Sequence, residues 1–276
     1  MIPLRITHLT KQYGHRLAVE DLSLDIQRGT VFGLVGRNGA GKSTTISCLL
    51  GLIPKTSGEI ALFGERLRPR IFDRIAYVPE TNCLDDWMTT RQHIEFRRRC
   101  FSHFDRTLMS RLMERFEIEP ERTLRKLSKG QRQAVALALA FAQRPDLMIL
   151  DEPALGLDPL MQRRLLDSIV SAAADGTAVL FSSHQIGHVE QAAERIGILD
   201  HGRLVLEADV DDLRAKRFLV EAVFDDGHLE QRYANGDVTA VEAQLRARSP
   251  VSMGRRPMNM EQIFLTTIGE TKERQE

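Results

Sequence analysis

The sequence has few of the features that mark secreted or membrane-spanning chains. Its 276 residues include only three cysteines, Cys48, Cys83 and Cys100, at unrelated spacings, with no C-x-x-C pair. This pattern argues against a disulfide framework and favours a reducing compartment. The first residues, MIPLRITHLT, lack the basic and then apolar segments of a signal peptide. The longest strongly apolar run, Ala134 to Ala142, is about half as long as a membrane-spanning helix. We therefore expect the chain to be soluble.

The chain also lacks net charge. Lysine plus arginine equals aspartate plus glutamate, 38 against 38. No overall basic field therefore attracts the protein to nucleic acid or to an anionic membrane surface, and we expect no nucleic-acid partner. Hydrophobic residues make up 42% and charged residues 28%, as in an ordinary globular protein. The length suits one large domain with a small appendage.

Hydrophobic periodicity predicts an α/β core with a parallel sheet. Leu22, Leu24 and Ile26 alternate with polar residues, as in a half-buried strand, and Val31–Val35 is apolar enough for a strand buried on both faces. A helix is expected from about Lys42 to Leu50. Alternating strands and helices are typical of a parallel sheet. Further strands are predicted at Glu59–Phe63, Leu147–Leu150, Val179–Phe181, Ile196–Leu199 and Leu204–Leu206.

Two segments differ from this core. Residues 85–142 carry apolar side chains at helical spacing and many arginines, which predicts a helical subdomain. Residues 216–276 form a separate small α+β unit, so the main domain spans 1–215. In this unit Asp226 and Gly227 predict a hairpin turn, Asn259 a helix start and Gly269 a helix end. The three methionines of this segment are expected to be core residues rather than a recognition surface: Met253, Met258 and Met260.

A phosphate-binding loop follows the strand Val31–Val35. The segment fits G-x-x-x-x-G-K-[ST] without gaps and consists of Gly36, Arg37, Asn38, Gly39, Ala40, Gly41, Lys42 and Ser43, with Thr44 next to it. Glycines let backbone N–H groups and the following helix N-terminus face an anion. Lys42 can reach the β- and γ-phosphates, and the Ser43 hydroxyl can bind Mg²⁺. A chance match is the alternative, and the strand-to-helix setting argues against it.

An acidic pair ends the apolar run Leu147–Leu150. Asp151 is placed to hold Mg²⁺, and Glu152 to orient the water that attacks a nucleoside triphosphate. The alternative is that both acids merely precede a helix with Pro153 in its first turn. The upstream phosphate loop favours the functional interpretation.

Further motifs resemble those of ABC ATPases and lie in the same order. They are Leu127–Gln133 (LSKGQRQ, the signature, with Lys129 where glycine is commoner), Ala154–Asp158 (ALGLD, the D-loop) and Ser182–His184 (SSH, the switch histidine). The resemblance covers about residues 2–215. It implies a P-loop NTPase core of ABC ATPase type with an antiparallel β subdomain and a helical signature subdomain.

The resemblance also implies roles for single residues. Tyr13 would stack on adenine, while His184 and Asp158 would belong to the catalytic site. Ser128, Gly130 and Gln131 would bind the γ-phosphate held by a second protomer, which gives a head-to-tail homodimer closed by ATP. A helix N-terminus has the partial positive charge for such a contact.

One residue departs from the family pattern. Glu80 stands where many members carry glutamine, and a glutamate accepts hydrogen bonds without donating any. It is expected to contact Mg²⁺ or its waters; the alternative is a solvent-facing residue. Glutamate here, with the LSKGQ form, is similar to the branch that serves exporters of antibiotics, lipids and other hydrophobic compounds. The arginine-rich stretch Arg91–Arg99 is either a docking surface for a membrane subunit or a solvated helix face.

The sequence thus predicts an ATP-hydrolysing subunit of an ABC exporter, with ATP and Mg²⁺ as cofactors and no other metal. It would act at the cytoplasmic face of the cell membrane, bound to separate membrane-spanning subunits. Two alternatives stay open: an importer ATPase, and a soluble ABC ATPase acting on ribosomes or DNA. The tail from residue 216 is expected to stabilise the chain, with a ligand site or a dimer clamp as alternatives.

Overall fold

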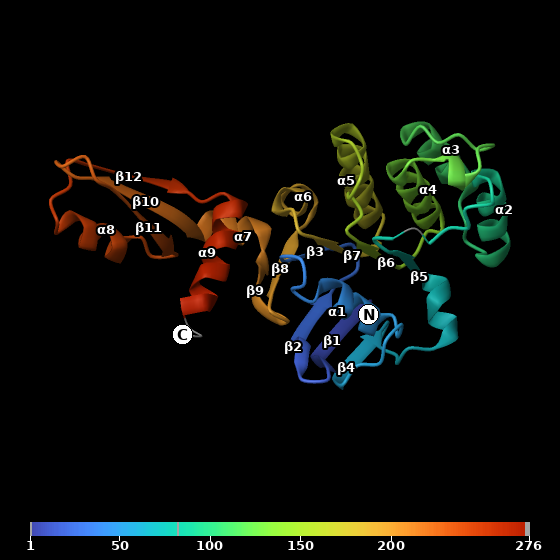
Figure 1. The fold of residues 1–276 in the computed structure, drawn as a ribbon, viewed down its shortest axis with the longest axis horizontal. Helices are drawn as coiled ribbons and strands as arrows, with labels where there is room; N and C mark the ends of the chain where they lie inside the picture. Colours follow the sequence, from blue (N-terminus) through green and yellow to red (C-terminus); the bar gives the residue numbers. More distant parts are fainter. Residues whose placement is uncertain (1, 82, 274–276) are drawn as a thin grey trace.

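The computed structural model describes residues 2–81 and 83–273. Its centre is a six-stranded sheet in the order β5-β6-β7-β3-β8-β9, all parallel except for the last strand (Figure 1). The strands are β3 (Val31–Val35), β5 (Ile75–Val78), β6 (Leu147–Asp151), β7 (Ala178–Ser183), β8 (Arg195–Asp200) and β9 (Arg203–Asp209). The parallel core predicted from the alternation of strands and helices is therefore confirmed.

Each face of this sheet has its own hydrophobic core. Val31 and Val35 of β3 point to the face covered by α4 (Lys129–Ala142), α5 (Pro159–Ala174) and α6 (Ile186–Ala192). Phe32 and Leu34 point to the other face, which packs on α1 (Lys42–Leu49). Gly33 lets α6 approach closely, because a Cβ there would lie 2.3 Å from Val189 Cγ1.

The antiparallel subdomain lies beneath α1 (Figure 1). It has the order β2-β1-β4, formed by β1 (Leu4–Tyr13), β2 (Arg16–Ile26) and β4 (Ser57–Leu62). Leu22, Leu24 and Ile26 are buried in the core shared with β3, as their alternation predicts. A short 3₁₀ segment, η1 (Pro69–Arg74), leads from this sheet to β5.

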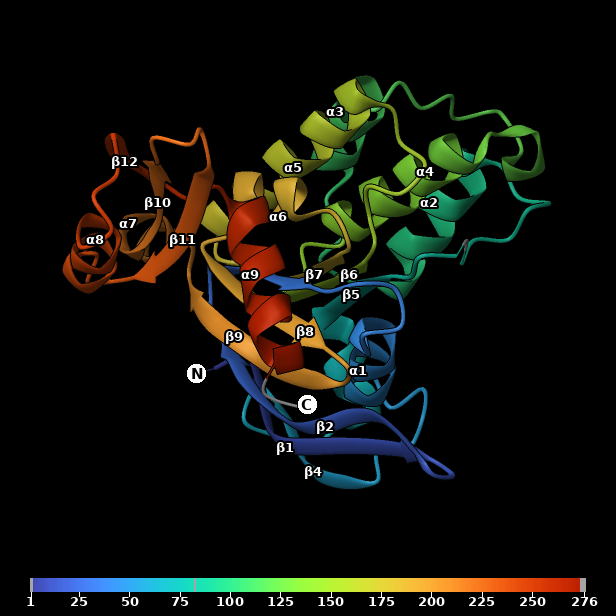
Figure 2. The ribbon, with the colours of Figure 1, turned by 60° about the vertical axis from the view of Figure 1, so that its left-hand side comes forward.

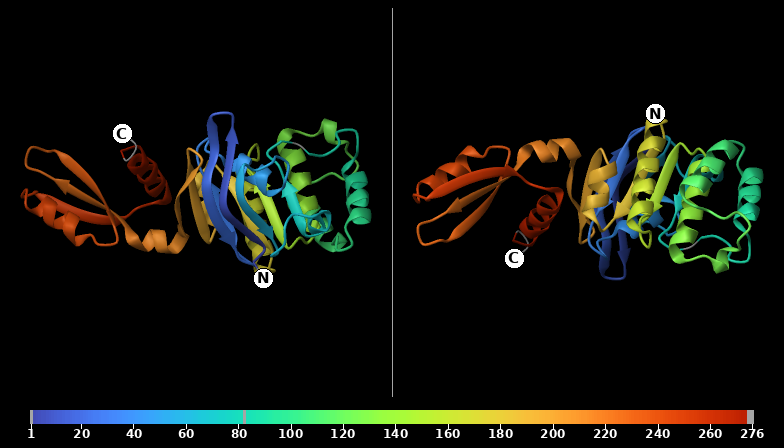
Figure 3. Two further views of the ribbon diagram at one scale, coloured as in Figure 1. Left: turned by 90° about the horizontal axis from the view of Figure 1, so that it is seen from below. Right: turned by 90° about the horizontal axis from the view of Figure 1, so that it is seen from above.

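The helical subdomain lies at one end of the molecule, beside β5 (Figure 3). It contains α2 (Thr90–Cys100), α3 (Arg106–Arg115), η2 (Leu124–Lys126) and α4. The predicted insert at 85–142 therefore has the expected helical character. Within the described ranges, 2–81 and 83–273, no helix has both the length and the apolar content needed to cross a membrane.

The C-terminal unit begins after α7 (Val210–Lys216) and projects from the opposite end (Figure 3). Its sheet has the order β11-β10-β12, from β10 (Arg217–Val223), β11 (Leu229–Asn235) and β12 (Ser252–Pro257). The predicted hairpin is confirmed, with Val223 opposite Leu229. Helix α8 (Thr239–Arg246) covers one face and supplies Leu245 to a small core of its own.

The last helix, α9 (Met260–Glu273), returns to the main domain and lies against α6 and β9 (Figure 2). Met258 and Met260 are buried in the same core as Val189 of α6, which confirms their predicted role as core residues. Asn259 caps the helix, because its Oδ1 accepts from the backbone N–H of Gln262 at 2.8 Å. The predicted helix end at Gly269 is wrong. This glycine lacks the positive φ of a helix-terminating turn, and the helix continues through it.

Candidate functional site

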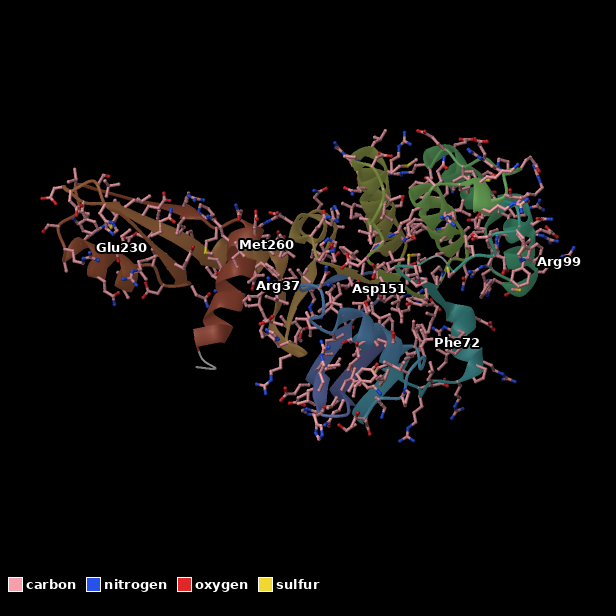
Figure 4. All side chains as sticks on the ribbon, in the orientation of Figure 1. Arg37, Phe72, Arg99, Asp151, Glu230 and Met260 are labelled. Atoms are coloured by element: carbon pink, nitrogen blue, oxygen red, sulfur yellow. The ribbon has the colours of Figure 1, made fainter. Side chains whose placement is uncertain are left out.

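A cleft of about 660 Å³ lies between the main sheet and the antiparallel subdomain, at the carboxyl ends of the parallel strands. Figure 4 shows Asp151 at the centre of the molecule, where the helices above meet the antiparallel sheet below. The lining residues are Tyr13, Arg16, Ala18, Asn38, Gly39, Ala40, Gly41, Lys42, Ser43, Thr44, Glu80, Glu152, Leu155 and His184. The structure therefore brings most of the sequence-predicted site residues together.

The phosphate loop needs a glycine at position 41. Gly41 has φ 112°, and a Cβ there would lie 2.5 Å from the carbonyl oxygen of Ala18. Gly41 is also the N-cap of α1, and no side chain caps this helix end. The first N–H groups of α1 are therefore available to an anion, in the field of the helix dipole. This end of the cleft fits a phosphate group.

Lys42 is the buried cation of the cleft, with 5% of its side chain exposed. Its Nζ donates to the carbonyl oxygens of Gly36 at 2.7 Å and Arg37 at 3.4 Å, and lies 3.3 Å from Glu152 Oε1. Gly36 and Arg37 thus contribute backbone to Lys42, whereas Asn38–Thr44 line the cleft itself. Oε1 of Glu152 is buried and accepts no hydrogen bond from the described residues. A water molecule would satisfy it.

The acidic pair is held by a serine that the sequence analysis did not single out. Asp151 ends β6 directly opposite Ser182 of β7. The Ser182 hydroxyl donates to Asp151 Oδ1 at 2.5 Å and accepts from the Glu152 N–H at 3.0 Å. One buried side chain thereby fixes both acids. The only sequence signal was its place in the Ser-Ser-His segment.

Glu152 has a strained backbone and a histidine partner. Its φ of 48° lies in the left-handed region, which a residue with a Cβ adopts at a cost of roughly 1 to 3 kcal/mol and which recurs at functional sites. Its Oε2 is 2.8 Å from His184 Nδ1. His184 therefore lies on one side of the carboxylate, with Lys42 on the other.

Two further predicted residues lie at the edges of the cleft. Tyr13 is 49% exposed, so one face of its ring is available for stacking. Glu80 follows β5 and is exposed to the cleft. Nearby, burial together with the charge of Asp151 raises the pKa of Tyr77 to about 12, so this phenol stays neutral.

The signature residues lie outside the cleft. Ser128 is the N-cap of α4 and forms a reciprocal capping box with Gln131, and both side chains are exposed. Gly130 lies against the D-loop, since a Cβ there would be 2.5 Å from Gly156 O. Asp158 is the N-cap of α5, accepting from Met161 N at 3.0 Å. None of these residues is among those that line the cleft in the same chain.

Comparison with known proteins identifies the family. Residues 19–155 match the ABC transporter family. Over 289 residues, the chain is 32% identical to "ABC transporter ATP-binding protein YtrB" of Bacillus subtilis (strain 168), covering 98% of each chain. The chain belongs to the ATP-binding proteins of ABC transporters.

Other ABC proteins share the sequence and the fold. Bacitracin transport ATP-binding protein BcrA of Bacillus licheniformis is 33% identical, with 77% of this chain and 72% of that protein covered. Nod factor export ATP-binding protein I of Sinorhizobium fredii (strain NBRC 101917 / NGR234) is 31% identical over 97% and 86%. A solved ATP-binding subunit of an ABC transporter superposes with a TM-score of 0.71 at 31% identity, over 78% and 92% of the two chains.

Family membership gives the activity in general terms. The chain is an ATP-binding and ATP-hydrolysing subunit of an ABC transporter. Subunits of this family act together with membrane subunits and dimerise.

Proposed function

We propose that two copies of this chain close head to tail around ATP and power an exporter built from separate membrane-spanning subunits. The observation that carries the proposal is the divided site. The cleft supplies Lys42 and Glu152 but not the signature, whereas Ser128 and Gln131 form an exposed capping box at the N-terminus of α4, outside the cleft. A second copy would bring that N-terminus to the γ-phosphate and complete the site.

The cargo class follows from the relatives. The relatives include a bacitracin transport protein and a Nod factor export protein, which supports export of an antibiotic, lipid or other hydrophobic compound. The chain would then bind peripherally at the cytoplasmic face of the membrane. The arginine-rich helix α2, with Trp87 exposed before it, is the surface we assign to the membrane subunit.

In the proposed reaction, the phosphate loop and Lys42 bind and orient the β- and γ-phosphates. Ser43, Asp151 and Glu80 would hold Mg²⁺, which neutralises charge on the phosphates. Glu152 orients the attacking water and accepts a proton from it, and His184 holds Glu152 and contacts the γ-phosphate. Tyr13 stacks on adenine, and Asp158 holds the D-loop against α5. Positioning and electrostatic stabilisation therefore supply most of the rate enhancement.

Replacing Glu80 with glutamine tests its proposed contact with Mg²⁺. The amide keeps the size of the side chain but removes one negative charge from the mouth of the cleft. We expect half-maximal ATPase activity to need several-fold more Mg²⁺, about 1 kcal/mol of metal affinity, with ATP affinity nearly unchanged. The measurement is a Mg²⁺ titration of ATPase activity at fixed ATP. A Mg²⁺ dependence identical to that of the unmodified protein would place Glu80 in solvent.

Recovery of the intact assembly tests the transporter itself. A tagged Glu152→Gln variant would be purified from its native membranes in mild detergent with Mg²⁺ and ATP, and its partners identified by mass spectrometry. The proposal requires a multi-span membrane protein in amounts equal to the ATPase. A membrane subunit accompanied by an extracellular binding protein would indicate an importer. Ribosomal proteins or nucleic acid without a membrane subunit would overturn the transport function.

A further inference from the structure

Gln162, on the first turns of α5, connects the D-loop to the helix that follows the switch histidine. Its Nε2 donates to the carbonyl oxygens of Leu157 at 3.0 Å and Ala154 at 3.4 Å. Both acceptors belong to the D-loop turn. Because an amide nitrogen only donates, these two contacts fix the orientation of the Gln162 side-chain amide. They turn Gln162 Oε1 away from the D-loop.

His188 of α6 completes the connection. Its Nε2 lies 3.3 Å from Gln162 Oε1. Since a carbonyl oxygen only accepts, this contact requires a hydrogen on Nε2. Burial lowers the pKa of His188, while the nearby Glu152 charge opposes this effect and His184 adds to it. The neutral Nε2–H tautomer meets this requirement.

The connection joins two parts of the proposed reaction site. At one end, His184 immediately precedes Gln185, which is the N-cap of α6. Nδ1 of His184 contacts Glu152. His188 lies one turn along the same helix, with its backbone N–H donating to Gln185 O at 3.2 Å. At the other end, the D-loop turn touches the start of α4, where Gly156 O lies against Gly130.

We propose that Gln162 and His188 are positioning residues that hold the D-loop in register with the Glu152–His184 pair. The inference rests on the proposed roles of that pair in hydrolysis. The two side chains thereby couple the state of the cleft in one protomer to the signature surface that the same protomer presents to its partner. Neither residue touches the nucleotide cleft, so they act through these neighbours.

The test compares substitutions that break and keep the connection, in the full chain. Gln162→Leu removes every hydrogen bond, Gln162→Glu keeps the shape but places a carboxylate against two carbonyl oxygens, and His188→Leu removes the second link. His188→Gln keeps a donor. Arg163→Ala, at an exposed position beside Gln162, is the matched control. We expect the three breaking variants to lower kcat about tenfold and to reduce the Hill coefficient for ATP, with single-protomer ATP affinity within about twofold.

His188→Gln should recover most of the activity lost in His188→Leu, and Arg163→Ala should match the unmodified protein. Thermal unfolding without nucleotide identifies any variant that fails to fold, and the isosteric Gln162→Glu serves in place of Gln162→Leu in that case. Unchanged kcat and Hill coefficient in folded Gln162→Glu, while Glu152→Gln is inactive, would overturn this inference alone. Full turnover by Glu152→Gln would instead overturn the proposed function beneath it.

Discussion

Replacing Glu152 with glutamine is expected to lower the rate of ATP hydrolysis by about a thousandfold while leaving ATP bound. The amide keeps the size of the side chain and its hydrogen bond to His184, but it cannot take up a proton from the attacking water. The buried negative charge 3.3 Å from Lys42 disappears, so the γ-phosphate meets less repulsion. The variant should therefore accumulate as an ATP-bound dimer.

Two measurements check this result. Phosphate release reports turnover, and size-exclusion chromatography with light scattering, with and without Mg²⁺ and ATP, reports the dimer. Glu190→Gln is the matched control, because it makes the same chemical change on α6 at a surface ion pair with Arg214, 3.0 Å long. That variant should hydrolyse ATP at the normal rate. Normal turnover by Glu152→Gln would remove Glu152 from its proposed role, and a monomer with bound ATP would contradict the head-to-tail closure.

The parts of the site that were predictable from sequence are those whose chemistry is local. The phosphate loop depends on the conformation of consecutive residues, so Gly41 and Lys42 reveal it directly. The acidic pair is also contiguous and ends an apolar strand. Ser182 escaped prediction because its role depends on the register of β6 with β7, which brings it opposite Asp151 from 31 residues away. A serine at the end of a strand carries no sign of that pairing.

The same distinction applies to the fold. Alternation predicted the strands, but the amphipathic pattern of α9 does not say which surface the helix covers. The structure places its apolar residues against α6 and β9, in the same core as Leu219 of β10. Gly269 was misread because a glycine ends a helix only where the chain enters the left-handed region. In an exposed helical position it merely costs about 1 kcal/mol relative to alanine.

Replacing Lys42 with alanine is expected to weaken ATP binding about a hundredfold, because the phosphates lose the buried cation of the cleft. The change should also destabilise the nucleotide-free protein by about 3 kcal/mol, since the buried Glu152 carboxylate loses the lysine charge beside Oε1 and keeps only its contact with His184. Thermal unfolding and equilibrium ATP binding separate these effects. In the double variant Lys42→Ala/Glu152→Gln the buried charge of Glu152 is removed together with that of Lys42, so stability should largely return while ATP affinity stays low. Recovery of binding together with stability would mean that Lys42 serves the fold and not the phosphates.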